Sequence, residues 1–308
     1  MTALGVSVVI PAFNRPEMTA RAVRSALGQR PDPPFEVVVV DDCSTDHTGA
    51  AARAAGARVI HHAVNRGEGG ARNTAIREAQ QPWVALLDSD DEWLPGHLAA
   101  LWPLRDDHVV LGSTAVATCA DAPPRLWGRE RNTPEALRSP ADLLRAGNAL
   151  VASSVLVRRD LVLAVGGFRE DLRMGADLDL WLRVLERGTG LVSPAVTVRY
   201  HVHADQVSGD RAALWLAHRE IVDTYADRPW HTPALRAHVE GYLLWNELRS
   251  GDRATVARCA ARLTTDPRRL AGVLDVVSAR ARMSVRSWRY RRVTARRAGG
   301  SASTTASG

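Results

Sequence analysis

Residues 35–46 read FEVVVVDDCSTD, so that four consecutive valines lead directly into a cluster of acidic and hydroxyl side chains. β-Branched residues favour strands, and a strand without polar alternation is typical of a sheet that is buried on both faces. We therefore expect a buried strand over Phe35–Val40. The same arrangement, an apolar strand followed by polar residues, occurs at Val6–Ile10 and at Trp83–Leu87.

Stretches with helical spacing of apolar residues separate these strands, and they begin near Pro16, after Asp46 and near Ala71. Alternation of helices with apolar strands predicts an α/β fold, in which a mostly parallel sheet carries helices on both faces. Ligands of such sheets bind at the carboxyl ends of the strands, which is where the polar residues 41–46 and 88–91 lie.

The second half of the chain is less regular, and from about Arg211 onward it contains only helical patterns. The end of the chain, after Ala298, is rich in Gly, Ser and Thr, a composition typical of disorder. We expect three parts: an α/β domain over residues 1–210, a C-terminal helical region with a basic end over 211–298, and a disordered tail over 299–308.

The composition excludes several classes of protein. The 308 residues include 45% hydrophobic and 24% charged residues, the balance of a globular protein. No uncharged stretch reaches the roughly 20 residues of a membrane-spanning helix, and residues 1–6 lack the basic start of a cleaved signal peptide. The three cysteines give neither a disulfide framework nor zinc-ligand spacing. These features predict a cytoplasmic location.

Three carboxylates, Asp88, Asp90 and Asp91, lie within four residues after one of the predicted strands. Packed together they repel one another unless a cation lies among them. Oxygen ligands suit Mg²⁺ or Mn²⁺, and these ions commonly bridge to substrate phosphates. The alternative is a solvated acidic turn that caps the next helix. Further carboxylates at residues 41–46, on the same predicted sheet edge, favour the ligand site.

Two residues near these strand ends have both a functional and a structural interpretation. Asp42 could accept a hydrogen bond from a base imide or from a ribose hydroxyl, or it could form an Asx turn or cap a helix. Phe13 could stack on a base, or it could pack in the core.

Together these segments resemble the family-2 glycosyltransferases, which have the Rossmann-like GT-A fold. The family's motifs occur in order between residues 5 and about 208. The matching stretches are Val6–Asn14 (VSVVIPAFN), Glu36–Asp46 (EVVVVDDCSTD), Asn65–Asn73 (NRGEGGARN), Trp83–Trp93 (WVALLDSDDEW), Gly166–Phe168 (GGF) and Gly175–Arg183 (GADLDLWLR).

The resemblance implies a site for a nucleotide-sugar donor. Pro11, Ala12 and Phe13 would line the base pocket, and Asp42 would bind the base. Asn65 and Arg72 match elements near the donor. Arg72 would serve the diphosphate, with a structural salt bridge as the alternative.

The resemblance also implies a divalent cation, Mg²⁺ or Mn²⁺, as cofactor. Asp90 and Asp91 match the acidic motif, in which one carboxylate binds the ribose and the other holds the metal. Asp88 would support them without direct contact. His203 matches a histidine that can approach the metal or the diphosphate, and a structural role is its alternative.

Asp177 matches the catalytic base of the family. Many relatives have Glu-Asp at this point, whereas this chain has Ala176 before Asp177, so acceptor contacts should not be transferred from relatives. Asp179 is the competing carboxylate. A structural role of Asp177, favouring the dipole of the helix that it begins, is compatible with catalysis.

The implied activity is that of an inverting, metal-dependent glycosyltransferase of the hexosyltransferase type. It would move a sugar from a nucleotide sugar, UDP-sugars being the commonest donors of this fold, to a hydroxyl of a carbohydrate, lipid-linked or other acceptor in polysaccharide, envelope or glycoconjugate synthesis. One alternative is a degenerate module that binds nucleotide sugars without turnover. A nucleotidyltransferase fits poorly, because it expects a lysine-rich phosphate loop and the chain has no lysine.

Eight arginines follow the last acidic residue, Asp275, and they lie between Arg280 and Arg297 together with Trp288 and Tyr290. Basic residues are attracted to anionic lipid, and Trp and Tyr suit a membrane interface. This pattern predicts reversible, peripheral binding to the cytoplasmic face of an anionic membrane. The alternative is a solvated helix that pairs with acidic residues of the α/β domain, and nucleic acid is a weaker third option.

Overall fold

The computed structural model describes residues 5–29, 33–119, 122–126, 133–203 and 211–250. The chain divides into two compact units, Met1–Thr232 and Pro233–Gly308. In the second unit the structure describes one helix, α9 (Pro233–Ser250). Everything that follows on the fold and the site concerns the first unit.

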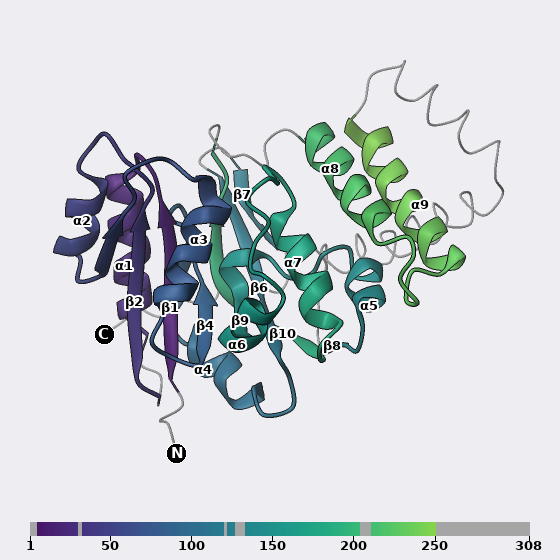
Figure 1. Ribbon diagram of the computed structural model, residues 1–308, viewed down its shortest axis with the longest axis horizontal. Helices are drawn as coiled ribbons and strands as arrows, with labels where there is room; N and C mark the ends of the chain where they lie inside the picture. The colour runs from purple at the N-terminus through teal and green to yellow at the C-terminus, as the bar shows by residue number, and fades with distance from the viewer. Residues whose placement is uncertain (1–4, 30–32, 120–121, 127–132, 204–210, 251–308) are drawn as a thin grey trace, which may run out of the picture. The chain divides into compact units, whose positions relative to one another are not determined.

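The centre of the first unit is a ten-stranded sheet in which the order β3-β2-β1-β4-β9-β6-β10-β5 forms one path, with β7 paired to β6 and β8 paired to β10 (Figure 1). The strands are β1 (Val6–Ala12), β2 (Phe35–Asp41), β3 (Arg58–His61), β4 (Trp83–Leu86), β5 (Glu92–Trp93), β6 (Val110–Cys119), β7 (Ala122–Leu126), β8 (Glu135–Leu137), β9 (Val155–Arg158) and β10 (Gly190–His201).

The four strands β3, β2, β1 and β4 run parallel to one another, as the apolar runs predicted. Beyond β4 the sheet is mixed, since β9 is antiparallel to both of its neighbours while β6 and β10 are parallel. Parallel neighbours bring their carboxyl ends to one edge. Residues that follow β1, β2 and β4 therefore lie close together.

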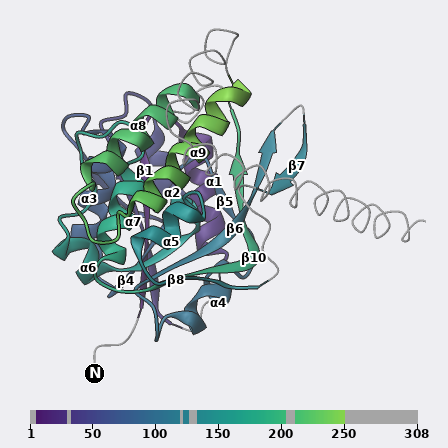
Figure 2. The same ribbon diagram turned by 90° about the vertical axis from the view of Figure 1, so that its right-hand side faces the viewer.

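The helices cover both faces of the sheet (Figures 1 and 2). Helices α1 and α2 contact each other on one face, and α3, α6 and α7 form a continuous layer on the other. The helices of this unit are α1 (Pro16–Leu27), α2 (Thr48–Ala54), α3 (Gly67–Glu78), α4 (His97–Leu101), α5 (Pro140–Arg145), α6 (Arg159–Ala164), α7 (Ala176–Leu185) and α8 (Arg211–Thr224), with short 3₁₀ turns at Trp102–Leu104 and Ala152–Ser154.

Side chains of β1 alternate between the two layers. Val8 and Ile10 belong to a core cluster with Val23 of α1 and Leu98 of α4. Val9 is also fully buried and points to the opposite face, because successive side chains of a strand alternate. The sheet is thus apolar on both faces, which explains why its first strands lack polar alternation.

The predicted α/β fold, with a mostly parallel central sheet, helices on both faces and helices at the C-terminal end, is confirmed. Residues 150–157, an apolar run that alone predicts a strand, form one only in part, because β9 begins at Val155. A 3₁₀ turn precedes it, in which the Ser154 hydroxyl donates to the Val151 carbonyl at 2.7 Å. The domain boundaries at 210 and 298 stay predictions. In the part of the chain that the structure describes, no helix is long and apolar enough to cross a membrane.

Candidate active site

The ends of β1 and β2 are tied together by hydrogen bonds. Asp42 donates its backbone N–H to the Ala12 carbonyl at 2.8 Å, and the Asn14 side chain accepts the Thr45 N–H at 2.9 Å. Asn14 adopts a positive φ of 49°, which asparagine tolerates better than most residues. Ala12 is buried, as is Pro11, whereas 44% of Phe13 is exposed. Phe13 is therefore not part of the core, and its role in stacking on a base stays a prediction.

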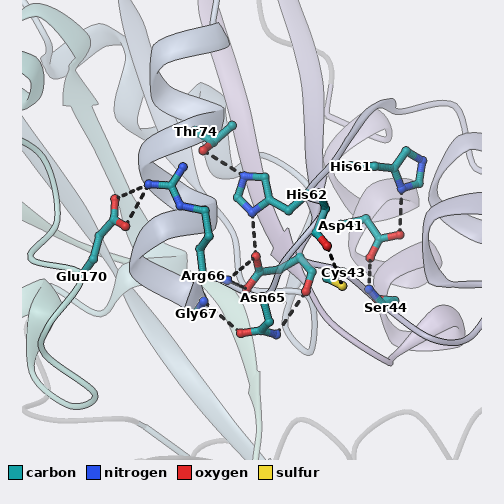
Figure 3. Close-up of polar contacts among 12 residues, drawn as sticks. Asp41, Cys43, Ser44, His61, His62, Asn65, Arg66, Gly67, Thr74 and Glu170 are labelled. Carbon is teal, nitrogen blue, oxygen red and sulfur yellow. Dashed lines mark hydrogen bonds and ion pairs between the residues drawn. The ribbon is translucent and has the colours of Figure 1, made fainter.

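The carboxylate of Asp42 is only 4% exposed and is held by hydrogen bonds from two elements (Figure 3). Arg66 donates its backbone N–H to both carboxylate oxygens, at 2.9 and 3.1 Å. His62 Nδ1 lies 2.6 Å from Oδ1. Asn65 donates to the Asp42 carbonyl at 3.1 Å. Asp42 and Asn65, which are both predicted to bind the nucleotide-sugar donor, thus belong to one hydrogen-bonded cluster.

The turn that follows Asn65 begins α3. Gly67 has a φ of 74°, a conformation that favours glycine, and its N–H donates to Asn65 Oδ1 at 3.1 Å. Arg66 forms an ion pair with Glu170 at 3.0 Å (Figure 3). Glu170 in turn accepts from Asn73 at 3.0 Å. The start of α3 is thereby fixed to the loop after residue 168.

Arg72 is a buried cation at the centre of the site. Its guanidinium pairs with Asp88 at 2.5 Å and with Glu68, and it lies 5.1 Å from the centre of the Phe168 ring. Burial lowers the pKa of Arg72, but Asp88, Glu68 and Asp177 raise it more, so the net direction is upward. Arg72 therefore stays charged, and its ion pairs match the structural alternative that the sequence left open.

Asp90 lies where three segments of the chain meet. Its Oδ2 accepts from Arg15 at 2.5 Å and lies 2.9 Å from Nε2 of His203, while Arg21 donates to its backbone carbonyl at 3.2 Å. The Asp90 side chain keeps 13% of its surface exposed. The other ring nitrogen of His203, Nδ1, is buried without a hydrogen-bond partner among the described residues.

Asp91 differs from Asp90, because both of its oxygens are occupied by protein hydrogen bonds. Ser153 donates its hydroxyl to Oδ2 at 2.6 Å, and the backbone N–H of His201 donates to Oδ1 at 3.1 Å. The residue is 0% exposed. Burial raises the pKa of Asp91, and repulsion from Asp88 and Asp90 raises it further.

These residues fit a divalent cation, though they do not form a complete cage. Among the described residues no group of three or more His, Cys, Asp or Glu side chains is arranged to hold a metal ion. Asp90 and His203 supply an oxygen and a nitrogen 2.9 Å apart at a partly exposed position. Phosphate oxygens and water would complete such a site, as is usual for Mg²⁺. Each Asp91 oxygen already accepts one protein hydrogen bond, so a metal would have to use the second acceptor position of one of them.

Asp177 lies in the first turn of α7, whose N-cap Gly175 has a φ of 74°. Its Oδ1 accepts the Leu178 N–H at 2.8 Å, and Oδ2 lies 3.5 Å from Nδ2 of Asn148. The charge of Asp177 contributes to the raised pKa of Arg72. The negative charge of Asp177 therefore stabilises the charged form of Arg72.

Asp179, the competing carboxylate, is 0% exposed and fully engaged. Arg183 pairs with it at 2.5 Å, and the hydroxyl of Tyr225 donates to it at 2.7 Å. Burial, together with the hydrogen bond to Asp179, raises the pKa of Tyr225 to about 12. Asp179 thus joins α7 to the end of α8 and presents no oxygen to an acceptor.

Several residues at this site were not predicted from the sequence. Ser153 supports Asp91 and also accepts the N–H of Asp88 at 3.1 Å. His218 of α8 packs against the start of α7, since a Cβ built on Gly175 would lie 3.1 Å from its ring. Burial lowers the pKa of His218, while Asp177 opposes that shift. The sequence contained no signal for Ser153 or His218, because neither belongs to a motif.

Comparisons with known proteins show what this chain is similar to. The family described as glycosyl transferase family 2 matches residues 7–155. The chain is 34% identical over 201 residues to the succinoglycan biosynthesis protein ExoU of Rhizobium meliloti (strain 1021), an alignment that covers 59% of this chain and 57% of that protein. The chain thus spans less than two thirds of the length of this relative.

Two solved structures share the fold. Crystalline S. aureus TarS 1-349 in complex with UDP-GlcNAc has a TM-score of 0.63 and 20% identity, over 90% of this chain and 81% of that chain. The mannosyltransferase PcManGT from Pyrobaculum calidifontis, in complex with GDP-Man and Mn²⁺, has a TM-score of 0.58 and 20% identity, over 90% of this chain and 86% of that chain.

Proposed function

We propose, from the premise that the chain belongs to glycosyl transferase family 2, that it is an inverting glycosyltransferase. In this proposal it moves a sugar from a nucleotide-sugar donor, a UDP-sugar in the first instance, to a hydroxyl group of an acceptor. The relative named for succinoglycan biosynthesis supports an acceptor in polysaccharide or envelope synthesis.

Two carboxylates in different settings support the proposal. Asp90, whose side chain is 13% exposed, lies beside His203, and Asp177, in the first turn of α7, raises the pKa of Arg72 through its negative charge. A transferase that breaks a sugar–diphosphate bond needs both: a group that binds the leaving diphosphate, and a base for the attacking hydroxyl.

Donor recognition would use the cluster at the ends of β1 and β2. Asp42 would accept a hydrogen bond from the base, and the exposed ring of Phe13 would stack on it, with Pro11 and Ala12 as the wall behind. Asn65 would act indirectly, because it holds the Asp42 backbone.

In the proposed mechanism Asp90 and His203 would hold a divalent ion, Mg²⁺ or Mn²⁺, which would supply positive charge against the departing diphosphate. Asp91 would support this site through its charge, or bind the ion with the second acceptor position of one of its oxygens. Arg72 adds a fixed positive charge to the same edge.

Asp177 would take the proton from the acceptor hydroxyl as that oxygen attacks the anomeric carbon. A hydroxyl is a weak nucleophile, and general-base assistance contributes roughly 10²–10⁴-fold to such reactions. With Asp177 on the face opposite the leaving group, one displacement inverts the anomeric centre. Asp179 takes no part, because its oxygens are bound by Arg183 and Tyr225.

A donor screen tests the proposal. The full chain is heated with each of a panel of nucleotide sugars in the presence of Mn²⁺, and the unfolding temperature is compared with that of the chain and Mn²⁺ alone. Stabilisation by one nucleotide sugar, followed by its consumption, supports the proposal. Binding without consumption would favour a module that binds nucleotide sugars without turnover. That alternative is considered because this chain has Ala176 where many relatives have a glutamate. No stabilisation by any nucleotide sugar would contradict both.

Location stays part of the proposal. A cytoplasmic protein that binds the inner face of an anionic membrane would meet lipid-linked acceptors there. The segment that suggested this binding, Arg280–Arg297, lies outside the described residues.

A further inference from the structure

Two adjacent histidines at the end of β3 each contact one of the two adjacent aspartates at the end of β2 (Figure 3). His61 Nδ1 lies 3.1 Å from Asp41, and 52% of the His61 side chain is exposed. His62 Nδ1 lies 2.6 Å from Asp42, and only 9% of the His62 side chain is exposed. The parallel register of β2 and β3 creates both pairs, because it sets His61 opposite Asp41.

Chemistry fixes the direction of the hydrogen bond between His62 and Asp42. An ionised carboxylate can only accept, so His62 Nδ1 carries a hydrogen and donates it to Asp42. The Thr74 hydroxyl lies 3.0 Å from His62 Nε2 and can donate its own hydrogen there. The same hydroxyl oxygen accepts from the guanidinium of Arg77 at 3.1 Å.

The hydrogen bonds to Asp42 use both acceptor positions of one carboxylate oxygen and only one position of the other. Oδ1 receives His62 Nδ1 at 2.6 Å and Arg66 N at 2.9 Å. In the described part of the chain, Oδ2 receives only the shared Arg66 N–H, at 3.1 Å. A carboxylate oxygen has about two acceptor positions. Oδ2 therefore keeps acceptor capacity. Asp42 also donates its backbone N–H to the carbonyl of Ala12, the residue before the exposed Phe13.

We infer that His62 is a positioning residue for the donor base: it orients Asp42 as an acceptor-only group that selects nucleotides whose base carries a ring N–H. This inference rests on the proposed nucleotide-sugar function. Uracil, thymine and guanine present a ring N–H to a carboxylate, whereas cytosine and adenine present a lone pair at the corresponding ring nitrogen. A ring nitrogen with a lone pair would face Oδ2 acceptor against acceptor. Nucleotides that carry cytosine or adenine are therefore bound more weakly.

Two isosteric variants separate this role from simple packing. The amide of asparagine reaches about as far as Nδ1 of histidine, so His62→Asn keeps a donor for Asp42. The amide of glutamine reaches about as far as Nε2, so His62→Gln keeps the contact with Thr74 and loses the donor to Asp42. The neighbouring His61→Gln is the matched control, because His61 is half exposed and contacts Asp41 rather than Asp42.

The experiment is isothermal titration calorimetry of the full chain with UDP and with CDP. The wild type binds UDP more tightly than CDP. His62→Gln raises the Kd of UDP about tenfold, which is the effect of losing one hydrogen bond to a charged group. The ratio of the Kd of CDP to the Kd of UDP becomes smaller than in the wild type. His62→Asn and His61→Gln stay within about threefold of the wild type. Thr74→Val shifts UDP binding in the same direction as His62→Gln but by less, and it provides a second readout if His62→Gln does not fold.

Several results would overturn the inference. His62→Gln and His62→Asn could weaken UDP and CDP binding equally, with parallel losses of unfolding temperature, which is the result of a purely structural role. A wild type that binds CDP as tightly as UDP would refute base selection while leaving the transferase function intact. A wild type that binds none of UDP, GDP, dTDP, CDP and ADP would instead refute the proposed function, and the inference with it.

Discussion

Asp177→Asn and Asp179→Asn are two isosteric changes on one helix with opposite expected effects. Asp177 is partly exposed, and its Oδ1 accepts only the Leu178 N–H next to it at 2.8 Å. An asparagine oxygen keeps that bond, so the unfolding temperature falls only by the small effect of removing a charge from the first turn of the helix. The lost carboxylate can no longer take a proton, and kcat falls by about 10²–10⁴-fold while the KM for the donor changes little.

Asp179→Asn acts on stability instead. The Asp179 carboxylate is fully buried between Arg183, at 2.5 Å, and Tyr225, at 2.7 Å. Replacing it by an amide leaves the guanidinium without its counter-charge, which costs about 3–5 kcal/mol for a buried pair. For a unit of this size the unfolding temperature falls by about 2–4 °C per kcal/mol, so a loss of roughly 6–20 °C is expected.

The assay measures donor consumption at saturating acceptor and donor, alongside thermal unfolding of each variant. Comparison at a temperature where both variants are folded separates catalysis from stability. An Asp177→Asn variant with wild-type kcat would refute the assignment of the base. Asp179 would then be assigned as the base if Asp179→Asn were inactive without any loss of unfolding temperature.

Three further predictions concern the divalent cation, the buried His97 and the basic C-terminal segment. Excess EDTA abolishes turnover and Mn²⁺ restores it, and Asp90→Asn lowers the affinity for Mn²⁺; full activity in EDTA would remove the metal from the mechanism. Burial lowers the pKa of His97 from 6.5 to about 3, so below pH 6.5 the unfolded chain binds a proton that the native chain does not, and stability falls as the pH falls. Between pH 6.5 and 5 urea unfolding of the wild type should lose roughly 2 kcal/mol more than that of His97→Gln, and equal losses in both would contradict this account. A truncation after Val277 loses salt-sensitive co-sedimentation with anionic liposomes; equal partition of the truncated and full chains would separate residues 280–297 from any membrane binding.

Much of the fold follows from local patterns. The valine run of β2 and the polar residues after β1, β2 and β4 predicted parallel strands whose polar ends lie close together, and the parallel pairing is observed. The antiparallel strand β9 could not be predicted, because its partners β4 and β6 are distant in sequence and its own pattern is the same apolar run. Periodicity reports burial and does not report direction.

The candidate site was predictable where a motif is contiguous and unpredictable where the fold joins distant segments. The i,i+4 spacing of Asp179 and Arg183 is a sequence signal for an ion pair, and the structure contains that pair. The contact of Ser153 with Asp91 spans 62 positions and has no local signal. His62 falls between these cases, because adjacent histidines and adjacent aspartates end neighbouring strands but only the register pairs them.

The anomeric configuration of the released sugar tests the central claim most directly. Water can replace the acceptor when the full chain is incubated with its donor and Mn²⁺, and proton NMR within the first minutes reports the anomer before it equilibrates. A single displacement assisted by Asp177 predicts the free sugar with the configuration opposite to that of the donor. A first product with the donor's own configuration would contradict the account.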